Sequence, residues 1–229
     1  MNPAKALFLF TATFSLVACS TPVPTDKQTL PPTPSATQEP SASPAPSDTA
    51  TPSETVIYDF MVHACEAVWT NNAQTLVCPS QSYGNIGSGY VEVRENTNIE
   101  GATELRGTAL LTHPSANGTF LGIFGAFPPI IIESGDQFRA TLSCVDQVEA
   151  VFCDVEFALE YYTENGAYID SQQTGWYWNQ TQDEATTDIA VDLSILAGQT
   201  VRLVLVVRDN GDPEGDYALW VEPQLWRTR

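Results

Sequence analysis

The sequence lacks the features by which several protein classes are recognised. Beyond residue 53 it contains no lysine, and its seven arginines there are outnumbered by 25 aspartates and glutamates. The formal net charge of the whole chain is −19. This balance excludes nucleic acid and anionic lipid as partners bound through charge.

Catalytic motifs are absent as well. We find no Gly-x-Ser-x-Gly elbow, no His-Glu-x-x-His, no phosphate loop and no dinucleotide fingerprint. The two histidines, His63 and His113, are interpreted as surface or capped residues rather than metal ligands or bases. With so many carboxylates, a pair at glycosidase spacing arises by chance and indicates nothing. We therefore expect a protein that is not an enzyme and needs no cofactor.

The apolar run near the N-terminus, Ala6–Ala18, is too short to cross a bilayer. It has 13 residues, whereas a spanning helix needs roughly 20. With Lys5 before it, this run is typical of an export signal. It ends in Leu16-Val-Ala-Cys19, which resembles the lipobox of bacterial lipoproteins. The resemblance implies that residues 1–18 are removed and that Cys19 is lipidated; the alternative is an ordinary secretory signal with a chance cysteine.

The next segment, Ser20–Ser53, has the composition of a tether. Of its 34 residues 22 are Pro, Ser or Thr, and only Val23 and Leu30 are large and apolar. Such a chain buries too little surface to offset its ordering entropy, so we expect disorder. The predicted organisation is a signal peptide (1–18), a lipidated cysteine with a linker (19–53) and one folded domain (54–229). The domain would be held at the cell surface, on the outer face of a bacterial membrane.

Helical periodicity is nearly absent from the domain, which excludes a helical fold. The strong segments have strand patterns separated by turn residues, as in an antiparallel β-sandwich. They are Tyr90–Arg94, Thr119–Phe124, Gln137–Cys144, Val155–Tyr162, Tyr168–Gln172, Gly175–Asn179, Asp188–Leu193, Val201–Arg208 and Tyr217–Pro223. Val201–Val207 is apolar except for Arg202 and should be central. Asp192–Gln199 should form a helical turn closed by Gly198.

Four cysteines remain in the domain, and an even number in an exported protein suggests disulfides. No pair has metal-site spacing. Cys144 and Cys153 are in phase with the apolar faces of their own strands, so we predict that they pair within a hairpin, with Leu142 opposite Val155. The remaining pair is Cys65–Cys78.

The stretch Val191–Trp226 combines an alternating strand, a Leu-Ala-Gly-Gln turn, a long apolar strand, a Gly/Asp loop and a final strand with a tryptophan. It resembles the C-terminal half of galactose-binding-like jelly rolls, and most of all the novel putative carbohydrate-binding module family. The resemblance covers about 36 of 176 residues and implies an all-β, antiparallel jelly-roll sandwich that binds carbohydrate. The domain also resembles an uncharacterised type found in bacterial surface lipoproteins. Residues 54–130 carry no motif of the family.

The stretch Gly175–Gln180 is the best ligand candidate. Trp176 and Trp178 share one strand face, where indole rings can stack on sugar rings, and Asn179 and Gln180 can hydrogen-bond hydroxyls. The alternative is a tryptophan pair packed in the sandwich.

The acidic stretch Asp209–Trp220 allows three interpretations. A calcium site needs six to eight oxygens, and the spacing of Asp209 and Asp212, the only metal candidates, is poor for one. Asn210-Gly211, Pro213 and Gly215 favour a turn, which we predict joins the last two strands as a hairpin. In this arrangement Tyr217, Leu219 and Val221 face the core and Trp220 covers the outer surface. The third interpretation is a sugar site, and its candidate residues are Asp209, Asn210, Asp216 and Trp220.

Two functions remain from different classes. One is a surface-displayed module that binds a glycan or a cell-envelope polysaccharide; the other is a structural or protein-interaction lipoprotein. An exposed aromatic cluster in a concavity would favour the first, and a flat surface with every aromatic buried would favour the second.

Overall fold

The computed structural model describes residues 53–80, 86–100, 108–115, 122–146, 152–181 and 185–229. They all belong to the second of the two units into which the chain divides, Thr49–Arg229. The signal peptide, Cys19 and nearly all of the predicted linker lie outside these residues, as do the first three residues of the predicted strand Thr119–Phe124. No helix among the described residues has the length and apolar character to cross a membrane.

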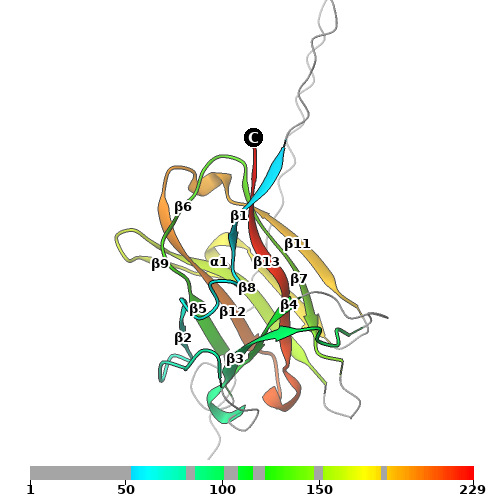
Figure 1. Cartoon of the computed structure of the whole chain (residues 1–229). Coiled ribbons are helices and arrows are strands. Elements are labelled where there is room, and N and C mark those ends of the chain that lie inside the picture. The colour runs from blue at the N-terminus through cyan, green and yellow to red at the C-terminus, as the bar shows by residue number, and fades with distance from the viewer. Residues whose placement is uncertain (1–52, 81–85, 101–107, 116–121, 147–151, 182–184) are drawn as a thin grey trace, which may run out of the picture. The chain divides into compact units, whose positions relative to one another are not determined.

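Two antiparallel sheets form the domain (Figure 1). The first sheet has the order β11 (Thr187–Asp192), β7 (Asp136–Cys144), β13 (Ala218–Thr228), β4 (Thr108–His113), β3 (Tyr90–Glu95), and β1 (Glu54–Asp59) also pairs with β13. The second has the order β10 (Tyr177–Thr181), β8 (Asp154–Thr163), β12 (Thr200–Asp209), β5 (Gly122–Ala126), β2 (Val68–Thr70), with β6 (Ile130–Ile131) on β12 and β9 (Tyr168–Ile169) on β8. Short helical turns are η1 (Ile86–Ser88), α1 (Ser171–Thr174), η2 (Ser194–Leu196) and η3 (Pro213–Gly215).

The chain repeatedly passes from one sheet to the other, as in a jelly roll. It crosses from β4 to β5, from β7 to β8 and from β11 to β12, then returns from β12 to β13. The predicted antiparallel sandwich is therefore confirmed. The predicted turn after β11 is also present as η2, and Gly198 closes it with a φ of +81°.

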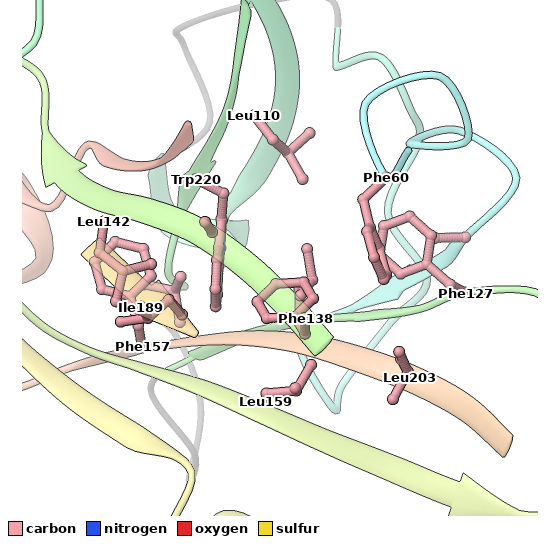
Figure 2. Packing of buried hydrophobic residues seen from close by; sticks show 14 of the residues in the cluster. Phe60, Leu110, Phe127, Phe138, Leu142, Phe157, Leu159, Ile189, Leu203 and Trp220 are labelled. Atoms are coloured by element: carbon pink, nitrogen blue, oxygen red, sulfur yellow. The ribbon is translucent and has the colours of Figure 1, made fainter. Parts of the chain in front are cut away.

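The core lies between the sheets, where alternate side chains of each strand meet. Figure 2 shows Trp220 of β13 against Phe157 of β8 and Phe138 of β7. The rings of Trp220 and Phe157 are nearly perpendicular, with centroids 4.9 Å apart. Strand β12 lies in the interior of its sheet, with Val201 and the residues from Leu203 to Val207 buried, as predicted.

The two predicted disulfides are confirmed, but the hairpin around one of them is wrong. Cys144 and Cys153 are bonded, as are Cys65 and Cys78. However, β7 and β8 belong to different sheets, so the first bond joins the sheets across the core. Leu142 is opposite Trp220 of β13 rather than Val155. Two cysteines on inward faces can meet either across a hairpin or across a sandwich, and the pattern of apolar residues is the same in both.

The predicted hairpin between the last two strands is wrong for the same reason, because β12 and β13 lie in different sheets. The predicted direction of Trp220 is wrong too: its side chain is fully buried in the core. Leu219 points to the opposite face, where it is buried in a second apolar cluster with Tyr90, Ile99 and Leu111. Since both faces of β13 are covered, the more apolar face did not identify the core.

One predicted strand, Tyr168–Gln172, ends early. The strand stops at Ile169, and α1 begins after Asp170, whose side chain accepts a hydrogen bond from the backbone N–H of Gln173. This N-cap favours a helical turn over an extended chain. Gly175 ends the turn with a φ of 75°, a conformation that glycine adopts readily. The helical turn α1 lies on the outer face of the second sheet, where the backbone N–H of Ser171 donates to Glu160.

Candidate functional site

The outer face of the second sheet carries its own small apolar layer. Ala158, Val204 and Val206 are buried there, and Phe124 and Tyr162 are among the half-buried side chains packed against them. These residues alternate along β8 and β12 with those that face the core. Phe124 and Tyr162 therefore cover part of the apolar layer on the outer face of the sheet.

A groove of about 430 Å³ opens on this apolar layer. Three aromatic rings line it, from Phe124 on β5, Tyr162 on β8 and Tyr168 on β9. The rings of the two tyrosines lie 4.8 Å apart and are inclined by 41°. The other lining residues are Thr70, Asn72, Ala126, Asp170, Val204 and Arg208. The groove thus combines aromatic faces with hydroxyl, amide, carboxylate and guanidinium groups.

Arg208 is held in place by two glutamates of β8. Its Nη1 donates to Glu156 at 2.7 Å and its Nη2 donates to Glu160 at 2.6 Å. The guanidinium lies over the ring of Phe124, 5.7 Å from its centroid. Burial opposes the charge of Arg208, but the two carboxylates outweigh it and raise the pKa. Arg208 is therefore a fixed cation. Lysine would not reproduce it, because its single ammonium group lacks the planar fork of the guanidinium.

Glu160 is fully buried under the groove and satisfied by donors from three elements. The hydroxyl of Tyr168, the backbone N–H of Ser171 and Arg208 all donate to its carboxylate. Burial disfavours ionisation, yet these donors together hold the pKa of Glu160 below its usual value. Burial and the bond to Glu160 also raise the pKa of Tyr168, so its hydroxyl stays a donor. The ring of Tyr168 is therefore fixed at the groove, with 38% of the residue exposed.

The predicted tryptophan pair faces the other way. Trp178 lies opposite Phe157 on β8, so its side chain is on the inner face of the sheet. Both Trp176 and Trp178 are half-buried and pack against the core at the sheet edge. Trp176 lies just before β10, so the two do not share one strand as predicted, but both side chains turn toward the core. Tyr177, which alternates with them, is 42% exposed on the outer face.

Of the two amide side chains predicted to bind a ligand, Gln180 is buried and Asn179 is exposed. Gln180 is buried, where its amide donates to the carbonyl of Ala185 and accepts from the hydroxyl of Thr187. The polar atoms of Gln180 are therefore already bonded to Ala185 and Thr187 within the protein. Asn179 and Asn210 are exposed neighbours, since the amide of Asn210 donates to Asn179 at 3.5 Å and to Asp154 at 3.2 Å.

The acidic stretch forms a turn between the sheets. Asp212 is exposed and caps η3 by accepting from the backbone N–H of Glu214. The carboxylates brought together are Asp209 and Asp216 rather than Asp209 and Asp212. Within the described residues, no three His, Cys, Asp or Glu side chains are grouped to hold a metal ion.

Asp216 is fully buried, and its Oδ1 accepts from the backbone N–H of Asp154 at 2.9 Å. Burial, together with the nearby carboxylate of Asp209, raises the pKa of Asp216 to about 8. Beside them, burial lowers the pKa of His113, whose Nδ1 lies 2.8 Å from the carbonyl oxygen of Pro114. Asp209, Asp216 and the core residue Trp220 are therefore parts of the framework, outside the groove.

The residues that line the groove were missed from the sequence, although one signal for them was present. The stretch Tyr161–Tyr168 places tyrosines on both sides of a Glu-Asn-Gly turn. In a hairpin, residues equidistant from the turn are opposite each other, and Tyr162 and Tyr168 are indeed paired. Their approach to Phe124 has no local signal, because β5 and β8 are joined only through β12.

Solved carbohydrate-binding modules show partial similarity to this fold. The CBM51-2 and INT domains of Clostridium perfringens ZmpB, in complex with GlcNAc, are 18% identical over 62% of this chain and 28% of that one, with a TM-score of 0.41. The CBM51 of Clostridium perfringens GH95, in complex with methyl-galactose, is 22% identical over 60% of this chain and 92% of its own, with a TM-score of 0.35. The CBM22-1 xylan-binding domain of Paenibacillus barcinonensis Xyn10C is 15% identical over 62% and 82%, with a TM-score of 0.36.

No family model matches the sequence, and no curated protein matches it. The solved structures are too distant from this chain to indicate its ligand.

Proposed function

We propose that this protein is an exported module, anchored to a membrane by a lipid on Cys19, that binds carbohydrate in the groove of its second sheet. The observation that supports this function most directly is the groove itself. Sugars present apolar C–H faces and hydroxyl edges, and the groove offers aromatic faces from Tyr162 and Tyr168 beside Asn72, Asp170 and Arg208. Its volume of about 430 Å³ lies within the range of small-ligand sites.

A binding role fits the groove better than catalysis. A glycosidase needs a carboxyl group with a raised pKa as its acid. Glu160 has a lowered pKa and gives its oxygens to donors of the protein itself. Glu156 is likewise paired with Arg208. Glu156 thus holds Arg208, and Glu160 holds both Arg208 and Tyr168.

Three tyrosine variants test the proposal. Tyr162→Ala and Tyr168→Ala remove groove rings. Tyr177→Ala is the control, because Tyr177 lies on the same face with an exposure of 42%, close to the 38% of Tyr168, and does not line the groove. The full chain, purified in detergent, should bind glycans on an array. For the best glycan, calorimetry should show several-fold weaker binding for each groove variant, since an aromatic contact contributes about 0.5–1.5 kcal/mol. Tyr177→Ala should bind like wild type, and melting curves would confirm that all variants are folded.

The alternative is a structural or protein-interaction lipoprotein, and the tryptophans favour it. Trp69 and Trp220 are buried, and Trp176 and Trp178 pack against the core. No glycan bound on the array, or equal binding by the groove and control variants, would support this alternative.

A further inference from the structure

The charge around the groove is negative although an arginine lines it. Arg208 is paired with both Glu156 and Glu160, so its charge is already more than neutralised. Asp170 adds a third carboxylate. One guanidinium against three carboxylates leaves two net negative charges, in a chain with 28 acidic and 9 basic residues.

Asp170 retains capacity to bind a ligand. Its Oδ1 accepts from the backbone N–H of Gln173 at 3.0 Å, and no described donor bonds to its Oδ2. An ionised carboxylate has about four acceptor sites. Asp170 therefore offers a negative acceptor to the groove while it caps α1.

The aromatic rings of the groove suit a cation as well as a sugar face. Aromatic faces attract ammonium and guanidinium groups within about 6 Å of the centroid. Phe124 already carries the guanidinium of Arg208 on its ring. Tyr162 and Tyr168 line the same groove next to Asp170, so an organic ammonium would meet aromatic faces and an anion together.

The geometry points to a glycan with free amino groups, such as an oligomer of glucosamine, as the ligand of this groove. This inference rests on the proposed carbohydrate function and narrows it. The hydroxyls and ring faces of this glycan bind the polar groups and aromatic rings of the groove, as those of a neutral sugar would. Its ammonium group binds Asp170 and the tyrosine faces. Glycans that carry uronate or sulfate groups are repelled by the net negative charge.

Two oligomers of equal length and linkage test the inference, one of glucosamine and one of N-acetylglucosamine. They differ only in acetylation, which removes the charge. At mildly acidic pH and low salt, the full chain in detergent should bind the glucosamine oligomer about two- to fivefold more tightly, the size of one exposed cation–aromatic contact or ion pair. The difference should shrink with added salt.

Asp170→Asn is the matched variant, because asparagine caps a helix as well as aspartate does and removes only the charge. It should weaken binding of the glucosamine oligomer much more than binding of the acetylated one, so that the preference for the free amine disappears. Oligogalacturonate should not bind measurably. Spermidine, which has amines without a sugar ring, should bind more weakly than the glucosamine oligomer.

Failure of this inference is distinguishable from failure of the proposed function. Equal binding of the two oligomers, or an unchanged preference in Asp170→Asn, overturns the amine specificity and leaves carbohydrate binding in place. Spermidine binding as tight as that of the glucosamine oligomer overturns the requirement for a sugar. Absence of binding to every glycan on the array overturns both proposals.

Discussion

Asp216 shows how one buried carboxyl group can make the stability of this domain depend on pH. Its Oδ2 and that of Asp209 are buried without a hydrogen-bond donor among the described residues. Two facing carboxylates need a proton between them, because both cannot be ionised in a buried site. The charged or titratable groups around them are Asp154, which also raises the pKa of Asp216, and His113, which burial keeps neutral.

We predict that stability falls as pH rises toward and through about 8. The folded state holds the proton on Asp216 up to that pH, whereas the unfolded chain releases it near pH 4. The stabilisation is thus complete below the unfolded pKa and is lost as pH rises through the folded one. Asp216→Asn should remove this part of the pH dependence, because its amide can donate to Asp209 at every pH. Urea midpoints between pH 4 and pH 9 would measure it, and parallel curves for the two proteins would contradict the assignment.

Among the structural elements, the crossing from β7 to β8 matters most for the position of the groove. It takes the chain from the first sheet to the second, and the Cys144–Cys153 bond closes it inside the core. The following hairpin of β8 and β9 then brings Tyr162 and Tyr168 together on the outer face. The disulfide thus joins the sheet that carries the groove to the sheet behind it.

Replacing both Cys144 and Cys153 by alanine should lower the free energy of unfolding by more than the roughly 3 kcal/mol of a short closed loop. Both sulfurs are buried in the core, so their loss also leaves a cavity. Replacing Cys65 and Cys78, of which Cys65 is exposed, should cost the loop term alone. Urea unfolding of the two double variants provides the comparison. Equal losses would show that the buried bond acts only through loop closure.

At the scale of the whole molecule, the proposed function combines an N-terminal lipid anchor, a linker and a folded domain. The domain contains two disulfides, as is typical of exported proteins. The lipid on Cys19 and the Pro/Ser/Thr-rich linker remain predictions from the sequence. The formal net charge of the whole chain, −19, disfavours binding to anionic lipid surfaces through charge.

The anchor is tested by Cys19→Ser. If Cys19 is lipidated, this variant should either be released from membranes or accumulate as a precursor that retains residues 1–18, because acyl chains supply about 0.8 kcal/mol per buried CH₂. Cell fractionation with immunoblotting distinguishes the forms. A processed variant that still sediments with membranes would contradict lipid anchoring through this residue.

The sequence by itself determined the all-β class, most strand positions and both disulfides. Each depends on local information: a two-residue apolar period, turn residues such as Gly198, and the phase of Cys144 and Cys153 within their strands. The β8–β9 hairpin was not predicted, although it has a local signal of the same kind, a Glu-Asn-Gly turn between the two tyrosines of the groove.

Only the tertiary structure decided which sheet each strand joins and which face of a strand is inside. Trp220 and Leu219 are both buried, Trp220 in the core and Leu219 in a cluster on the outer face of β13. Leu219 is buried there because residues such as Ile99 cover that face. Trp176 and Trp178 turn inward while Tyr177 turns out, because their partner strand β8 places Phe157 inside and Ala158 outside. Periodicity gives the alternation of side chains, but the face that becomes buried depends on what other segments pack against it.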